Sequence, residues 1–219
     1  MEGKTLAHLL KREPNLSIAD AQFILTEVAD ALSFVHAAGV LHRDIKPDNI
    51  LIEAATGRPI LTDFGIARAL GVDAPLTGET EALGTPEYMA PEQTIAGQHV
   101  DTRADIYSLG VLGYRLLDGR VPFTAPTAQE LAVQHASAHP VPLGELRPDV
   151  PLSLAAAIHR ALEKNPGPGG HPLPSSALHS RRPCRPSSPL LLAATAMSVS
   201  SRWTASFVLR SSCASRSPG

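Results

Sequence analysis

The sequence predicts an α+β fold that is mainly α-helical and contains one small β-hairpin. Apolar residues between Ile24 and Val35 recur at steps of three and four, as on one face of a long helix. Residues 104–117 are apolar on nearly every side, which is typical of a helix buried in the middle of a domain. Two short β-type runs, 49–52 and 59–62, predict the hairpin. The predicted core is therefore helical around one small hairpin.

The remaining elements follow from local start and stop signals. A short helix over residues 5–12 ends before Pro14, because the residue before a proline avoids the helical region. Ser17 is the expected N-cap of the long helix, and Gly39 is its expected C′ residue. The other expected elements are a hairpin turn at 56–57, a loop over 66–82, and helices over 127–137 and 152–164, separated by a proline-rich connection.

The amino-acid composition divides the chain near residue 166. Residues 1–165 carry 13 Lys and Arg against 21 Asp and Glu, and they contain no cysteine. Residues 166–219 carry six Arg, 13 Ser, eight Pro, both cysteines and no acidic residue. This second stretch has neither a helical nor a strand period. We therefore expect residues 167–219 to be a disordered Ser/Pro/Arg-rich tail.

The composition also bears on compartment and partners. A first part without cysteine needs no disulfide framework and suits a reducing cytoplasm. The chain opens on a polar, helix-like segment rather than on a secretory signal. No apolar run approaches the ~20 residues needed to span a bilayer. We therefore expect a cytoplasmic protein with no membrane segment, and we expect no nucleic-acid partner.

The chemistry-bearing residues gather between His42 and Asp63. The segment from His42 to Asn49 places a carboxylate (Asp44), a cation (Lys46) and an amide oxygen (Asn49) within six residues, and Asp63 adds a second carboxylate after the predicted hairpin. A base facing a hydroxyl, a cation on a phosphate and two oxygen ligands for Mg²⁺ are what phosphoryl transfer requires. The hairpin is expected to hold Asn49 and Asp63 at neighbouring strand ends, where both can reach one metal ion.

Three motifs in order carry a family resemblance. His-Arg-Asp-x-Lys-x-x-Asn at residue 42 is followed by Asp-Phe-Gly at residue 63 and Ala-Pro-Glu at residue 90. This order resembles the catalytic half of a eukaryotic-like serine/threonine protein kinase, and the run Gly-Thr-Pro-Glu-Tyr-Met-Ala-Pro-Glu-Gln looks bacterial. The resemblance implies a protein-kinase-like C-terminal lobe, ATP and Mg²⁺ as cofactors, and protein substrates with Ser or Thr hydroxyls.

The resemblance assigns catalytic and cofactor roles residue by residue. Asp44 looks like the catalytic base, and Lys46 like the contact to the transferring phosphate. Asn49 and Asp63 are the expected Mg²⁺ ligands. Leu51 resembles the apolar surface on which the adenine ring rests, although core packing also accounts for it.

Regulatory and peptide-site roles follow in the same way. Arg43 is expected to pair with a phosphate on the following loop, which an activating kinase would add in trans. Thr77 and Thr80 are the candidate acceptors, and Thr80 is favoured because it lies five residues before Thr85. Thr85 itself resembles the residue that binds Asp44 and Lys46 and shapes the peptide site.

Four residues are expected to be structural. His42 should pack beneath Phe64 rather than act as a base. Asp105 resembles the anchor that accepts hydrogen bonds from the catalytic-loop backbone. Glu92 should form a buried ion pair, but the arginine that normally pairs with it is missing from the expected position, where the chain has Gly169.

The resemblance covers residues 1–166, which correspond to the large lobe from the hinge onward. No Gly-x-Gly-x-x-Gly precedes His42, so the N-terminal β lobe is expected to be absent. Two readings follow: a serine/threonine protein kinase by family whose activity is impaired in this chain, or a non-catalytic kinase fragment or pseudokinase-like binding scaffold. A reading-frame shift near residue 166 is an alternative origin for the tail.

Overall fold

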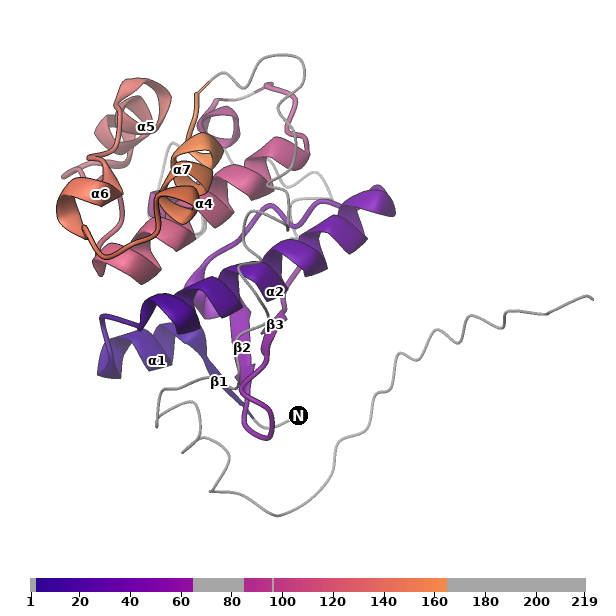
Figure 1. The fold of residues 1–219 in the computed structure, drawn as a ribbon. Coiled ribbons are helices and arrows are strands. Elements are labelled where there is room, and N and C mark those ends of the chain that lie inside the picture. The colour runs from indigo at the N-terminus through magenta and orange to yellow at the C-terminus, as the bar shows by residue number, and fades with distance from the viewer. Residues whose placement is uncertain (1–2, 65–84, 96, 165–219) are drawn as a thin grey trace, which may run out of the picture.

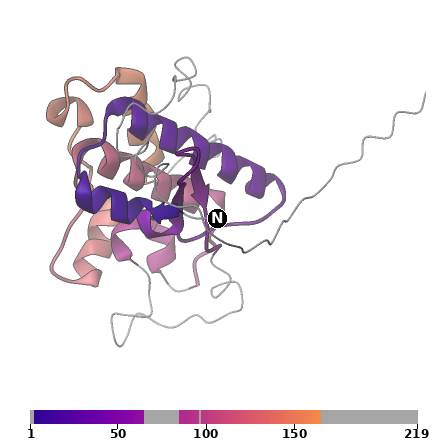
Figure 2. The same cartoon turned by 90° about the horizontal axis from the view of Figure 1, so that it is seen from below.

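The computed structural model describes residues 3–64, 85–95 and 97–164 of the chain. Figure 1 shows a small sheet on one side, helix α2 (Ile18–Ala37) lying along it, and a group of helices on the other side of α2. Helix α2 packs against both strand β3 and helix α4, so it joins the sheet to the helical part. Figure 2, turned by 90°, also places α5 and α6 away from the sheet.

The sheet has three antiparallel strands in the order β1 (Gly3–Thr5), β2 (Ile50–Glu53) and β3 (Pro59–Leu61). The register pairs Thr5 with Leu51 and Leu51 with Ile60. Ile50 and Ile52 are buried while Leu51 is half-buried, as expected for the alternating faces of a strand. The predicted hairpin is confirmed, but the two-stranded description was incomplete, because β1 adds a third strand to it.

Helix α2 begins and ends where the sequence indicated. Ser17 Oγ accepts a hydrogen bond from the Asp20 backbone N–H at 3.1 Å, as an N-cap does. Gly39 has φ of +74° just past the helix end, where its N–H donates to the His36 carbonyl at 2.9 Å. Between them, Ile24, Val28 and other apolar residues are buried in the core. Periodicity and caps together therefore define this helix.

Helix α4 (Thr102–Asp118) is the central helix of the other part. Its apolar residues are almost all buried, as the sequence predicts, and Gly119 ends it with φ of +82°. Helix α7 (Leu152–Ala161) packs closely against it at Gly110. A Cβ built on Gly110 would lie 2.8 Å from Cβ of Ala161, so only glycine permits this approach.

The other elements are short. They are α1 (Leu6–Arg12), α5 (Ala128–Ser137), α6 (Leu143–Leu146) and the 3₁₀ helices η1 (Pro47–Asn49), η2 (Pro86–Tyr88) and η3 (Pro91–Thr94). Thr5 and Thr127 cap α1 and α5 with their side chains. Among the described residues, no helix is both long and apolar enough to cross a membrane.

Two predicted boundaries need correction. The helix expected over 152–164 ends at Ala161, where the backbone tightens into bonds three residues apart: the Leu162 N–H shares the His159 carbonyl, and the Glu163 N–H bonds to the Arg160 carbonyl. The proline-rich connection before it contains the one-turn helix α6. The loop expected over 66–82 and the tail expected over 167–219 lie outside the described residues.

Candidate functional site

The predicted catalytic loop is held by a buried carboxylate on helix α4. Asp105 is 1% exposed and accepts hydrogen bonds from the backbone N–H of His42 at 2.9 Å and of Arg43 at 2.7 Å. His36 Nε2, at the end of α2, donates to the same carboxylate at 2.7 Å. Arg43 sits at φ of +65°, a conformation that side chains other than glycine rarely adopt. Asp105 therefore fixes a strained loop by its backbone, in the anchoring position that the resemblance predicts.

His42 is the first residue of the predicted catalytic loop, and its buried ring contacts Thr62, Asp44 and Phe64. It is fully buried, its Nε2 donates to the Thr62 carbonyl at 2.8 Å, and its Nδ1 accepts from the Asp44 N–H at 3.3 Å. Its ring lies 4.8 Å from the ring of Phe64, between centroids. Both ring nitrogens are occupied by the backbone. The predicted packing beneath Phe64 is confirmed, and His42 has no nitrogen left for acid–base chemistry.

Asp44 carries its carboxylate in a partly open position, with 35% of its side chain exposed. Lys46 Nζ lies 2.9 Å from Asp44 Oδ2, and Asn49 Nδ2 donates to the same oxygen at 2.8 Å. Asn49 Nδ2 also donates to the Asp44 backbone carbonyl at 2.8 Å. Within the described ranges, Asp44 Oδ1 has no hydrogen-bond partner. The arrangement orients one carboxylate oxygen and leaves the other free to accept a proton.

The hairpin brings Asn49 and Asp63 to neighbouring strand ends, as predicted. Thr62 joins them: its N–H and Oγ1 both donate to the Asn49 carbonyl, at 2.9 and 3.1 Å, and its Oγ1 lies 3.4 Å from Asp63 Oδ2. Asp63 is exposed and has φ of +55°. Asn49 is 7% exposed and uses its amide nitrogen on Asp44, which leaves its amide oxygen available.

This pair can supply two of the ligands of Mg²⁺, but not a complete site. Among the residues that the structure describes, no three or more His, Cys, Asp and Glu side chains gather to hold a metal ion. Carboxylate and amide oxygens are the hard ligands that Mg²⁺ prefers, and the ion commonly takes the rest of its shell from substrate phosphates and water. The residues present therefore fit a metal site that is completed by a phosphate-bearing substrate.

Leu51 lies on the less buried face of the middle strand, in line with Thr5 and Ile60 of the neighbouring strands. Its half-exposed position fits an apolar surface for a flat ring. It also packs across the sheet, so both readings given for Leu51 remain open.

Arg43 has a side chain that nothing in the described part of the chain satisfies fully. Its Nε is buried and has no hydrogen-bond partner there, while its backbone carbonyl accepts from Gln93 Nε2 at 2.9 Å. Thr77 and Thr80, the candidate phosphate acceptors, lie outside the described residues. The pairing of Arg43 with a phosphate therefore stays a prediction.

Two expectations differ from the structure. Thr85 forms no hydrogen bond to Asp44 or Lys46 within the described residues; it lies at the N-cap of η2 instead. Glu92 is half-buried rather than buried, and it forms no ion pair within residues 3–64, 85–95 and 97–164. On the short helix η3 its carboxylate keeps partial contact with water, so the missing arginine leaves a smaller penalty than a fully buried charge would.

Three residues that hold the loop were not identified from the sequence: His36, Thr62 and Gln93. His36 lies on α2 and bonds to Asp105, 69 residues away, whereas Thr62 follows β3 and Gln93 lies on η3, and these two bond to the loop directly. Gln93 had a local signal, because its Oε1 accepts from the Ala90 N–H as a glutamine does at the third position of a helix. The other two are visible only in three dimensions.

Comparison with known proteins identifies the family of the chain. The model of the protein kinase domain matches residues 1–167. The chain is 40% identical over 193 residues to serine/threonine-protein kinase PknA of Mycobacterium tuberculosis, covering 85% of this chain and 43% of that protein. It is 42% identical over 171 residues to pkn2 of Myxococcus xanthus (75% and 20% covered) and 36% over 166 residues to PknB of Mycobacterium leprae (76% and 26%). The chain thus spans less than half the length of these bacterial relatives.

Proposed function

The chain belongs to the protein kinase domain family, and we propose that it is the large lobe of a bacterial serine/threonine protein kinase. The reaction is transfer of the terminal phosphoryl group of ATP to a Ser or Thr hydroxyl of a protein. The observation that carries the proposal is the arrangement at Asp44. One oxygen is bound by Lys46 and Asn49, and the other has no partner among the described residues on a side chain that is 35% exposed.

In the proposed mechanism, Asp44 Oδ1 orients the substrate hydroxyl and takes its proton as the oxygen bonds to phosphorus. The bond from phosphorus to the leaving ADP oxygen breaks in the same step. Lys46 stays paired with Asp44 Oδ2 and is close enough to the reacting oxygen to oppose the charge on the transferred group. His36 and His42 take no part in proton transfer, since the backbone and Asp105 occupy them.

Asn49 and Asp63 would hold Mg²⁺ through the amide oxygen and the carboxylate. When bound, the metal neutralises charge on the phosphates of ATP. The protein itself positions the two ligands, because Thr62 hydrogen-bonds to the Asn49 carbonyl and lies beside the Asp63 carboxylate in the structure without ligand. Leu51 would support the adenine ring from below.

We further propose a regulatory role for Arg43 in a cytoplasmic protein. Its buried and unpaired Nε would donate to a phosphate placed on Thr80, or second on Thr77, by another kinase molecule. Thr85 would shape the peptide site beside Asp44 and Lys46.

These 219 residues contain no glycine-rich phosphate loop before His42, so we expect them to transfer little phosphate when purified alone. The alternative function, a non-catalytic scaffold built on the same lobe, predicts that activity is absent in every context. An assay that supplies the small lobe separates the two.

In that assay, the residues of PknA that precede its match to this chain are joined to residues 1–219. Mg²⁺, labelled ATP and a Ser/Thr-rich protein substrate are added. We expect the chimera to transfer phosphate, and Asp44→Asn to lower the rate by at least ~100-fold, as loss of a general base does. The matched control is Asp30→Asn, an exposed carboxylate on α2, which should leave the rate unchanged.

A chimera that folds and binds ATP but transfers no phosphate would favour the scaffold. Equal rates in the Asp44→Asn and Asp30→Asn chimeras would remove Asp44 from the mechanism.

The proposed origin of the tail is tested on the gene itself, by translating its other two reading frames from codon 166. We expect one of them to encode an arginine near position 169 followed by an amphipathic helix.

A further inference from the structure

A cluster of four side chains in the helical part has no role in the site described above. Its members are Tyr107 on α4, Phe123 between α4 and α5, His135 on α5, and Lys164 just after α7. The first three are buried, with at most 4% of each residue exposed, whereas Lys164 is half-buried. The lysine is therefore the member of the cluster that a small molecule in solution can reach.

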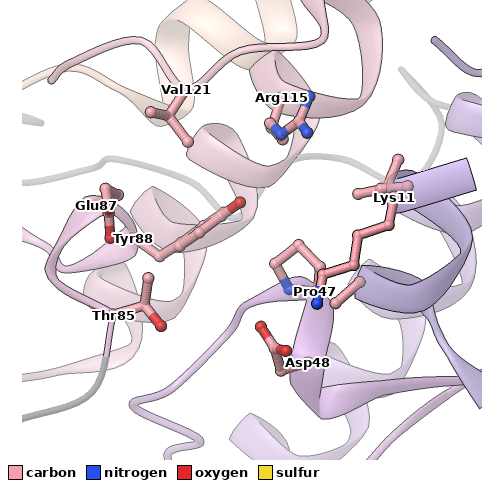
Figure 3. Close-up of a pocket in the computed structure, with 10 residues that line it drawn as sticks. Lys11, Pro47, Asp48, Thr85, Glu87, Tyr88, Arg115 and Val121 are labelled. Atoms are coloured by element: carbon pink, nitrogen blue, oxygen red, sulfur yellow. The ribbon is translucent and has the colours of Figure 1, made fainter. Parts of the chain in front are cut away.

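The cluster is separate from the pocket beside the predicted catalytic loop. That pocket has a volume of about 340 Å³, and its lining includes Lys11, Asp48 and Arg115 (Figure 3). Because Asp48 belongs to η1, which follows directly on Lys46, the pocket adjoins the site already described. None of the four cluster residues lines it. A role for the cluster must therefore come from its own chemistry.

The amine of Lys164 is held by one hydroxyl group and two aromatic rings. Its Nζ donates a hydrogen bond to the Tyr107 hydroxyl at 2.9 Å, and it lies 4.3 Å from the centre of the Phe123 ring and 5.0 Å from that of the Tyr107 ring. The Tyr107 oxygen lies 2.8 Å from His135 Nδ1 and can donate its own proton there. Tyr107 thus meets the amine with an oxygen that accepts one N–H, so a neutral amine keeps its lone pair free.

The charges around Lys164 do not include a carboxylate partner. In the part of the chain that the structure describes, Lys164 forms no ion pair. Glu92 acts on the cluster only at Tyr107, where it adds to the effect of burial in raising the pKa. The two ring faces favour an ammonium, but loss of water opposes it, and burial lowers the pKa of Lys164 to about 8. At pH 8, roughly half of the molecules then carry the neutral amine.

The chain has three other lysines, and their surroundings differ. Lys46 Nζ lies 2.9 Å from a carboxylate oxygen of Asp44, which stabilises its ammonium. Lys4 and Lys11 are exposed, so water solvates their charge. Lys164 therefore combines partial access to solvent with a desolvated amine that has no acidic partner in the described ranges.

We propose that Lys164 is a lysine acylation site, at which the amine takes an acyl group directly from an activated donor such as an acyl phosphate or an acyl thioester. The neutral amine is the nucleophile of this reaction, as in other lysines made reactive by loss of water. The hydrogen bond to Tyr107 and the ring of Phe123 fix its position. The inference goes beyond the proposed function, because it requires no phosphoryl transfer by the chain.

The reaction balances without a further reactant. The lone pair of Nζ attacks the acyl carbon and a C–N bond forms. The bond from that carbon to the phosphate oxygen, or to the thioester sulfur, breaks, and the leaving group takes the electron pair. The nitrogen loses one proton to the leaving group or to water, and nothing is oxidised or reduced. The product amide is uncharged, so acylation removes the cation from the two ring faces.

Mass spectrometry of the whole 219-residue chain tests the proposal without any substitution. The chain is incubated with acetyl phosphate or with acetyl-CoA, and the initial rate of acetylation is measured at each of the four lysines. At pH 7.5 we expect Lys164 to react at least ~5-fold faster than Lys4 and Lys11, because more of its amine is neutral. Between pH 7 and 9.5 the rate at Lys164 should level off above about pH 8, while the rates at the exposed lysines keep rising.

Unfolding and two matched variants provide the controls. In guanidinium chloride all four amines are solvated, so the preference for Lys164 should disappear. Lys164→Arg should remove the fast acetylation seen in the intact mass, and Lys4→Arg, at an exposed position on β1, should keep it. Circular dichroism checks that both variants are folded.

The proposal is overturned if Lys164 reacts no faster than Lys4 in the folded chain, if its rate rises with pH as that of Lys4 does, or if its preference survives unfolding. Preferential reaction with acetyl phosphate identifies an acyl phosphate as the donor, and preferential reaction with acetyl-CoA identifies a thioester; either result supports the site. An inactive kinase chimera would leave this result unchanged, so the two proposals fail separately.

Discussion

Two buried histidines, one in each part of the molecule, have opposite hydrogen-bond states. His42, under the predicted catalytic loop, has both ring nitrogens bonded, one to the Thr62 carbonyl and one to the Asp44 N–H. His135, on α5, is equally inaccessible, but its Nε2 has no partner among the described residues. Of the two rings, the one with both nitrogens hydrogen-bonded is His42, which holds the predicted catalytic loop in position.

The unsatisfied histidine belongs to a relay of three side chains. Lys164 Nζ donates to the Tyr107 hydroxyl at 2.9 Å, which lies 2.8 Å from His135 Nδ1. A Tyr107 hydroxyl that accepts from Lys164 can donate its own proton to Nδ1, and His135 Nε2 has no hydrogen-bond partner among the described residues. Burial, then the charge of Lys164, lower the pKa of His135 to about 4, and burial lowers that of Lys164 to about 8. Both ionisable ends of the relay are thus held away from their ordinary pKa values by burial.

The largest effect should come from removing Asp105. Asp105→Ala leaves two backbone N–H groups and His36 Nε2 without their acceptor inside the protein. We expect the free energy of unfolding to fall by about 4 kcal/mol, measured by urea denaturation. Asp30→Ala, at an exposed position on α2, should change it by less than about 0.5 kcal/mol. Similar losses in both variants would show that the loop network does not stabilise the fold.

The second effect is a pH dependence carried by His135. Its folded pKa is below the ordinary value of 6.5, so between pH 6.5 and 4 the unfolded chain binds a proton that the folded chain does not. The free energy of unfolding should therefore fall on acidification across this window, by about 3 kcal/mol from this residue. His135→Asn, which keeps an acceptor near Nδ1, should flatten the curve, while His139→Asn at an exposed site should not. Part of the pH dependence of unfolding should remain in His135→Asn, because burial also lowers the pKa of His159.

A third test probes packing in the helical part. Gly110→Ala would place a Cβ 2.8 Å from Ala161 Cβ and 3.3 Å from the Leu162 side chain. We expect a loss of about 1–2 kcal/mol, since overpacking exceeds the gain in helix propensity. Gly144→Ala on α6 has no atom within 4 Å of the added Cβ and should be neutral or slightly stabilising. Calorimetry that finds the same sign for both variants would contradict the close packing of α4 and α7.

The smallest effect is expected for Lys164→Met. The ammonium lies 4.3 Å from the Phe123 ring centre, but its desolvation offsets these contacts, so stability at pH 7 should change by less than about 1 kcal/mol. Between pH 8 and 10 the unfolded chain binds the Lys164 proton more tightly, so stability of the unaltered chain should rise with pH. The variant should lose this rise. Above pH 10, Tyr107, whose pKa burial raises, contributes in the opposite direction.

Sequence patterns predicted the elements that carry their own signals. Helix α2 has an apolar period, an N-cap serine and a terminal glycine, and α4 is apolar on nearly every side, so both could be predicted from the chain alone. Strand β1 has three residues and pairs with β2 across more than 40 intervening residues, so no local period marks it. Helix α6 is a single turn. The short and non-local elements were therefore the ones missed.

The site divides in the same way. The catalytic loop could be predicted because its functional residues are adjacent in sequence, and the hairpin placed Asp63 beside Asn49. Its support could not, since His36 acts through Asp105, 69 residues away, and Gln93 reaches the Arg43 carbonyl across a separation of 50 residues. The pocket that Lys11 and Arg115 line is likewise assembled from separate segments, so no spacing within the sequence predicts it.

Arg43 and Asp63 are the only non-glycine residues with positive φ in the described ranges, and that geometry has an evolutionary consequence. A left-handed backbone costs an L-residue about 1–2 kcal/mol, which glycine does not incur. Random mutation therefore has an accessible stabilising change at both positions, and only selection for what these side chains do opposes it. In copies of the gene released from that selection, we expect glycine to spread at positions 43 and 63 earlier than changes in the core. The residue types at positions 43 and 63 therefore indicate whether phosphoryl transfer has recently been under selection.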